Sequence, residues 1–120
     1  MMKLLTKDQH EKLLKNGTDT AQRLAEGLDT NDHPPVVKLF TPDAACTWLL
    51  SELDPEDPDI AFGLCDLGFG TPELGSVRLS ELASIRGRLG LPVERDLYFT
   101  ADKPLSAYAD DARLAGCIKA

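Results

Sequence analysis

The chain has 120 residues, of which 42% are apolar and 28% are charged, and its formal net charge is −7. This length suits one hydrophobic core, so we expect residues 1–120 to form a single domain. No apolar run approaches the roughly 20 residues that span a bilayer, and the N-terminus lacks the apolar stretch of a signal peptide. We therefore expect a cytoplasmic protein that makes no membrane contact.

The first predicted element is an N-terminal helical segment over 6–28. Thr6, followed three residues later by Gln9, is the pattern of a capping box, which predicts that a helix begins at this point. The Asn-Gly pair at 16–17 is typical of a helix end, so we expect this helix to stop there. A second short helix is predicted over 18–28, because apolar residues recur on one side of it.

The central segment 36–79 is predicted to be the sheet core. Its apolar runs have the length of strands, and Pro, Gly and Asp residues separate them, which indicates consecutive strands joined by tight connections. Trp48 lies inside one of these runs and is expected in the hydrophobic core. The four predicted strands are 36–40, 46–53, 60–67 and 74–79.

Residues 80–100 are predicted to form a helix and the last strand. Ser80 suits the N-cap of this helix, and Gly87 and Gly90 are expected to stop the helix. The last strand is predicted over 97–100, and a C-terminal helix over 104–116 follows it. Strands in succession with helices at both ends predict an α+β fold: an antiparallel sheet of four to five strands packed in two layers against short helices.

The negative charge is concentrated in the centre of the chain. Between Lys38 and Arg78 there are eight acidic residues and neither lysine nor arginine, whereas the rest of the chain holds 12 acidic and 13 basic residues. A surface of one sign repels nucleic acid and attracts cationic surfaces or metal ions. We therefore predict a partner-binding surface made of carboxylates. Its candidate residues are Asp43, Asp54, Glu56, Asp57 and Asp59.

Two other carboxylates, Glu52 and Asp66, are the alternative candidates for acid–base chemistry or metal binding, because they alternate with apolar strand residues. The acidic stretch lacks the spacing of an EF-hand, and the three cysteines lack C-x-x-C spacing, so no metal site and no cofactor are predicted. His10 and His33 lie far apart in polar stretches, and nothing places either of them beside a serine or cysteine nucleophile.

Three arginines, Arg86, Arg88 and Arg95, lie around a stretch rich in glycine before the last predicted strand. They could face an anion bound from outside, or they could pair with nearby carboxylates such as Glu94 and Asp96. Internal ion pairs are the interpretation that the sequence favours, since both signs of charge alternate in this stretch.

Four longer motifs carry a resemblance to a known family. KLFTPD at 38–43, TWLL at 47–50, ELGSV at 73–77 and GLPVERDLYF at 90–99 resemble a family of small bacterial proteins that is described only as a domain of unknown function. Its members are often described as plasmid-related, so the resemblance implies a setting on mobile genetic elements. Arg88 stands where this pattern leads us to expect proline. The family supplies no catalytic residues.

These observations favour a non-enzymatic protein-binding module over an enzyme. We expect an accessory protein of plasmids or mobile elements whose acidic surface binds a protein partner, for example to inhibit a host nucleic-acid-binding defence system or to assist plasmid maintenance. The alternative is a small metal-dependent hydrolase that uses the carboxylates of segment 52–66. The negative charge disfavours direct nucleic-acid binding, and the oligomeric state is left open.

Overall fold

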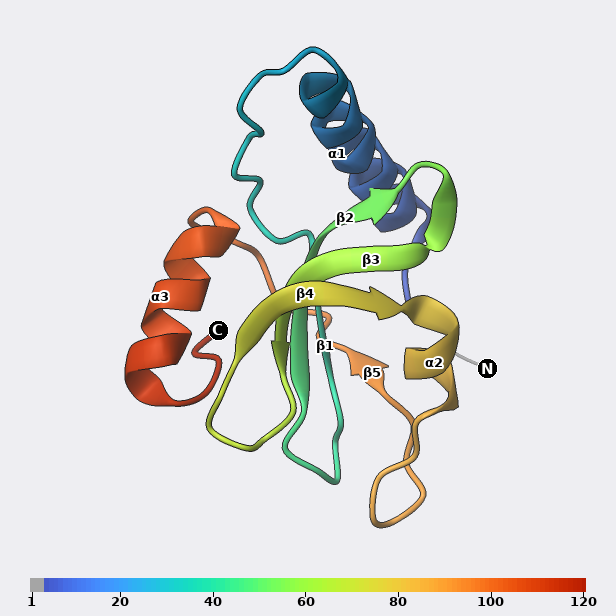
Figure 1. The fold of residues 1–120 in the computed structure, drawn as a ribbon. Coiled ribbons are helices and arrows are strands. Elements are labelled where there is room, and N and C mark those ends of the chain that lie inside the picture. Colours follow the sequence, from blue (N-terminus) through green and yellow to red (C-terminus); the bar gives the residue numbers. More distant parts are fainter. Residues whose placement is uncertain (1–3) are drawn as a thin grey trace.

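Five strands form one antiparallel sheet, which organises residues 4–120, the part of the chain that the computed structural model describes. The elements in chain order are α1 (Lys7–Ala25), β1 (Val37–Phe40), β2 (Thr47–Asp54), β3 (Asp57–Asp66), β4 (Glu73–Arg78), α2 (Leu79–Ser84), β5 (Glu94–Arg95) and α3 (Leu105–Ala115). The strands lie in the order β4-β3-β2-β1-β5, and each neighbouring pair is antiparallel (Figure 1). This architecture confirms the predicted α+β fold.

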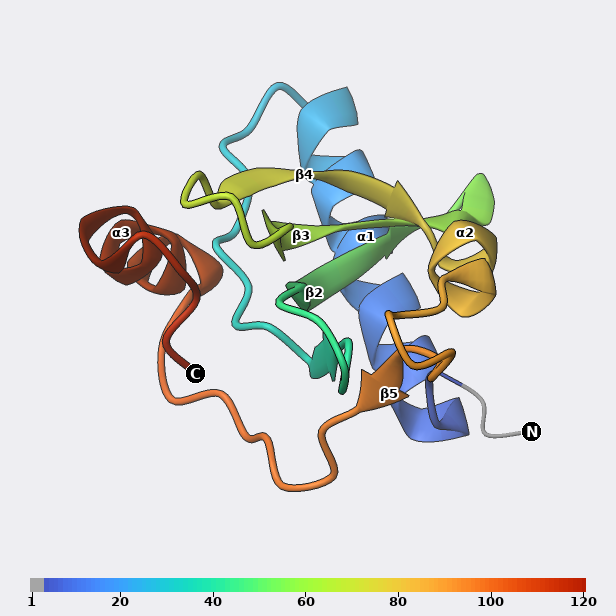
Figure 2. The same cartoon turned by 90° about the horizontal axis from the view of Figure 1, so that it is seen from below.

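Helices cover both faces of the sheet. On one face, here called the α1 face, the helices α1 and α2 pack around Trp48, which is 1% exposed and lies in the core as predicted. The opposite face, here called the α3 face, is covered by α3 (Figure 2), and Leu49 and Leu64 form one hydrophobic cluster there with Tyr108 of α3. The predicted two-layer packing therefore extends to a third layer, because α3 lies on the face away from α1.

The helix α1 begins as predicted and then continues where the sequence predicted an end. Thr6 is the N-cap, and it exchanges hydrogen bonds of 3.0 and 3.1 Å with Gln9 in a capping box. The predicted stop at Gly17 is wrong. A Cβ atom at Gly17 would lie 1.7 Å from the carbonyl oxygen of Leu53, so the glycine allows α1 to approach β2 closely. Neither α1 nor any other helix within residues 4–120 is both long and apolar enough to cross a membrane.

A β-bulge at Ser51 changes which face of the sheet the end of β2 presents. Leu50 pairs with Gly63 and Glu52 pairs with Phe62, so Ser51 is an extra residue without a partner in β3. Residues directly opposite each other in an antiparallel pair point to the same face. The bulge therefore places Glu52 on the α3 face beside Phe62, although Leu50 points to the α1 face.

From the start of β3 onward, the chain differs from the prediction at three places. The strand β3 begins at Asp57 and therefore includes half of the predicted acidic loop. Ser80 is not the N-cap of α2. The helix begins at Leu79, so Arg78 occupies the cap position and Ser80 lies inside the first turn. The last strand is β5, which pairs with β1, and the predicted strand over 97–100 is absent from the described sheet because the chain has already left its edge. The C-terminal helix α3 is confirmed, and Gly116 ends it with φ of 78°.

Candidate functional site

The acidic hairpin between β2 and β3 forms a sharp turn at the end of the sheet that also carries α2 (Figure 1). Only Pro55 and Glu56 separate the two strands. The carboxylate of Asp54 accepts a hydrogen bond of 2.9 Å from the backbone N–H of Glu56, which closes the turn. Both Asp54 and Glu56 are exposed, and no ion pair within residues 4–120 involves either of them. The tip of the hairpin therefore carries uncompensated negative charge.

The other two acidic residues of this hairpin are held by the protein itself. Arg78 lies 3.2 Å from a carboxylate oxygen of Asp57 and 3.6 Å from one of Asp59. Asp59 also accepts hydrogen bonds from the hydroxyl and the backbone N–H of Ser80, at 2.7 and 2.9 Å. The hydroxyl bond from Ser80 lowers the pKa of Asp59, desolvation opposes it, and Arg78 lowers the pKa further. The base of the hairpin is thus an internal ion cluster.

Asp43, the fifth predicted partner-binding residue, lies at the other end of the sheet in the loop between β1 and β2. One of its oxygens accepts backbone hydrogen bonds from Leu89 and Leu91, at 2.7 and 3.3 Å. Its other oxygen is buried and has no hydrogen-bond partner among residues 4–120. Asp43 therefore holds the loop that precedes β5, and it stands apart from the acidic hairpin.

The two alternative acid–base candidates are not brought together. Asp66 is 3% exposed and accepts hydrogen bonds from the backbone N–H groups of Gly68 and Ile118, at 2.8 and 3.0 Å. It pairs with Thr47 at the start of β2, whereas Glu52 lies five residues further along that strand, or roughly 15 Å away. Within residues 4–120 no group of three or more His, Cys, Asp and Glu residues is placed to hold a metal ion.

The three predicted anion-facing arginines differ in their contacts. Arg86 donates hydrogen bonds to the carbonyl oxygens of Ala83 and Ile85, at 3.0 and 2.8 Å. Arg95 donates to the carbonyl oxygen of Leu4 at 3.2 Å. Arg88 is exposed at the loop tip and forms no ion pair with a described residue. The structure therefore describes backbone contacts for Arg86 and Arg95, and the anion-facing role of the three arginines stays a prediction.

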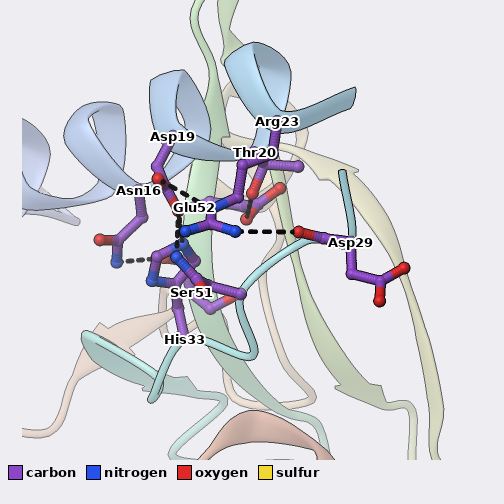
Figure 3. A network of polar contacts seen from close by, with 9 residues as sticks. Asn16, Asp19, Thr20, Arg23, Asp29, His33, Ser51 and Glu52 are labelled. Atoms are coloured by element: carbon purple, nitrogen blue, oxygen red, sulfur yellow. Dashed lines mark hydrogen bonds and ion pairs between the residues drawn. The ribbon is translucent and has the colours of Figure 1, made fainter. Parts of the chain in front are cut away.

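A network of polar contacts connects α1 to the following linker (Figure 3). Asp19 accepts hydrogen bonds from Asn31 at 2.8 Å and from Arg23 at 3.4 Å. The Nε2 atom of His33 lies 3.1 Å from a carboxylate oxygen of Asp19 but is not aligned for a hydrogen bond with it. The bond from Asn31 lowers the pKa of Asp19, desolvation opposes it, and Arg23 and His33 lower it further.

The same face of α1 also contacts the bulge of β2. Asn16 donates a hydrogen bond of 2.9 Å to the carbonyl oxygen of Ser51, and the hydroxyl of Thr20 donates one of 2.8 Å to the carboxylate of Glu52. Figure 3 shows these side chains projecting from α1 toward the strand. If Leu50, Ser51 and Glu52 alternated regularly without the bulge, Glu52 would point to the α1 face and away from the α3 face.

Two adjoining cavities of about 340 and 280 Å³ lie beside this contact. We call them together the α1 groove. Thr20, Leu24, Glu52 and Phe62 line both cavities, so these residues form the middle of the groove. One end reaches the linker and α3, and the other end reaches the acidic hairpin and β4. The residues at the first end are Thr30, Asn31, Asp32, His33, Ser51 and Leu105, and those at the second are Gly17, Ala21, Leu53, Asp54, Pro55, Ile60 and Ser76.

Sequence reasoning found Glu52 but missed the residues around it. Asn16, Asp19, Thr20 and Arg23 are spaced i, i+3, i+4 and i+7, which places them on one face of a continuous helix. That polar face was a usable signal. It was hidden because the glycine within it was interpreted as the end of the helix. His33 carried no local signal, since its contact with α1 joins residues far apart in sequence.

Comparisons with known proteins give one match. The family described as "Protein of unknown function (DUF2958)" matches residues 4–119, which is nearly the whole chain. A search of curated proteins and a search of solved structures gave no match.

Proposed function

The chain belongs to the DUF2958 family, and we propose that it is a non-enzymatic protein-binding module that acts through its acidic β2–β3 hairpin. The observation that carries this proposal is the exposed pair Asp54 and Glu56, which no described cation neutralises. Charges that are not used internally remain available to a cationic partner. They raise the association rate and favour partners of opposite charge.

The hairpin is also built to hold these charges in place. The strands β2 and β3 have 8 and 10 residues, they are joined by a two-residue turn, and the cluster around Arg78 fixes the base. The backbone of the turn is therefore held in one geometry, and the hairpin loses little conformational entropy when a partner binds. The partner we propose is a protein with a cationic surface, such as a host nucleic-acid-binding defence protein met by a mobile element. The mobile-element setting comes from the sequence motifs and belongs to this proposal, as does the cytoplasmic location.

The test is affinity capture from a bacterial host lysate, followed by measurement of the affinity for the captured protein at several salt concentrations. We compare the native chain with the double variant Asp54→Asn, Glu56→Gln. The matched control is Glu11→Gln, Glu81→Gln, which removes two exposed charges elsewhere. We expect binding that weakens with salt, falls about tenfold in the hairpin variant and is unchanged in the control.

Binding that is indifferent to salt and to the hairpin variant would contradict the proposal. A partner lost equally in the hairpin variant and in the control would show that net charge, and not the hairpin, carries the interaction. The hydrolase alternative has no comparable supporting observation, since Glu52 and Asp66 lie at separate places on the sheet and each accepts hydrogen bonds from the protein.

A further inference from the structure

Glu52 is a partly buried carboxylate without a counter-ion. The hydrogen bond from Thr20 occupies one of its oxygens, and no ion pair within residues 4–120 involves it. Asp19, which directly precedes Thr20 on α1, differs sharply, because it contacts Arg23, Asn31 and His33. A carboxylate that loses part of its hydration among apolar groups gains the most from a cation that binds beside it.

The surroundings of Glu52 suit a cation that carries an aliphatic stem. Leu24, Phe62 and Leu105 give the groove apolar surface, and Leu24 is 64% exposed although it lines both cavities. Lysine and arginine side chains bury their methylene groups on apolar surfaces while the charged end stays with polar partners. A cavity of about 340 Å³ accommodates one such side chain.

The groove is continuous with the acidic hairpin. Asp54 and Pro55 line the end of the groove and also form the hairpin turn. Asp32 lies at the opposite end, so both ends carry negative charge. An extended, basic segment of a partner could therefore lie along the groove from the hairpin to the linker, with a carboxylate at each end and Glu52 between them.

We propose that the α1 groove binds a lysine or arginine side chain from a basic peptide segment of the protein partner, with Glu52 as the anion that receives the charged group. This inference rests on the proposed function, and it names the part of the partner that is recognised. Leu24 and Phe62 contact the stem of the bound side chain, and Thr20 holds the carboxylate in position.

The test is an NMR titration of the isotope-labelled full chain with a short model peptide, acetyl-Leu-Lys-Leu-amide. The neutral comparison is the same peptide with its lysine acetylated, and the small-molecule comparison is n-butylamine. We expect the lysine peptide to shift backbone amide signals of the groove residues, and Glu52→Gln to weaken its binding at least tenfold. The glutamine keeps an acceptor for Thr20, so the variant is expected to fold. Glu81→Gln is the matched control and is expected to bind like the native chain.

The inference is overturned if the lysine peptide, at millimolar concentration, shifts no amide signals or only signals outside the groove. It is also overturned if the acetylated peptide binds as tightly as the lysine peptide, or if Glu52→Gln binds the lysine peptide as tightly as the native chain does. Binding of n-butylamine as tight as that of the peptide would also overturn it, since the groove would then be a site for small amines. The lysate experiment separates this failure from that of the proposed function. A captured partner that needs Asp54 and Glu56 but tolerates Glu52→Gln would leave the hairpin proposal intact and remove the groove from it.

Discussion

The acidic residues of the central segment use their charge differently at the two ends of the sheet. At one end, Asp43 and Asp66 lie in or beside the loops that connect neighbouring strands, and backbone N–H groups from distant segments bind their oxygens. At the other end, Asp54 and Glu56 sit at the tip of the hairpin and meet no described cation. Carboxylates that are equivalent in a charge count are thus structural in one place and available in the other. The partners of each oxygen, rather than the net charge, separate the two roles.

The largest effect that tests this comparison is expected at Asp66. Replacement by alanine would leave the N–H groups of Gly68 and Ile118 without their acceptor in a buried site, so we expect a loss of about 3 kcal/mol in the free energy of unfolding. Urea denaturation measures it, and hydrogen exchange should show faster exchange at Ile118. A loss below about 0.5 kcal/mol would remove Asp66 from the structural group.

A smaller loss is expected at Asp43. Asp43→Asn keeps the size of the side chain but removes the negative charge that faces the N–H groups of Leu89 and Leu91, so we expect about 1–2 kcal/mol of destabilisation. Hydrogen exchange of these two amides should rise more than that of residues in β2. Uniform acceleration across the sheet would contradict a local role for Asp43.

The base of the hairpin predicts a dependence on pH. Because the pKa of Asp59 is lowered in the folded chain from its ordinary value of 3.8, the ionised form contributes stability above that value. This contribution is lost as the pH falls through the lowered pKa of the folded state. An NMR titration of the Asp59 carboxyl carbon should give a midpoint below 3.8, and Ser80→Ala should move it upward. A midpoint unchanged by Ser80→Ala would refute the assigned cause.

The smallest effect is expected at the tip. The double variant Asp54→Asn, Glu56→Gln should change the free energy of unfolding by no more than about 0.5 kcal/mol, because neither side chain forms an ion pair with the described residues. Asparagine can still accept the hydrogen bond that closes the turn. Thermal denaturation checks this directly. A large loss of stability would mean that the tip is structural, and the comparison between the two ends would fail.

Features set by neighbouring residues could be predicted from the sequence. The capping box at Thr6 and Gln9 and the helix end at Gly116 depend on contacts within a few residues, and both are confirmed. The four main strands are confirmed as well, because each is marked locally by an apolar run between turn residues. Gly17 was misinterpreted because its role depends on Leu53, which is 36 residues away along the chain. A glycine required for close packing and a glycine that ends a helix look alike in sequence.

The candidate site was harder to predict for the same reason. The acidic hairpin was visible as a charge pattern, but the ion cluster at its base needed Arg78 and Ser80 to fold beside it. In the groove, the carboxylate of Glu52 accepts a hydrogen bond from Thr20, which joins residues 32 positions apart. Alternation of apolar and polar residues could not place Glu52 correctly either, since the extra residue at Ser51 interrupts that alternation.

The bulge at Ser51 shifts, by one residue, which positions of β2 face α1. Before it, even-numbered residues such as Trp48 and Leu50 face α1, and after it the odd-numbered Leu53 does. If β2 kept all of its residues but paired with β3 without the bulge, regular alternation would exchange the faces of everything behind Leu50. Leu53 would leave the core, and the acidic side chain before it would enter. With two residues between Leu50 and Leu53, the bulge is therefore as much a requirement of this fold as the identity of either leucine.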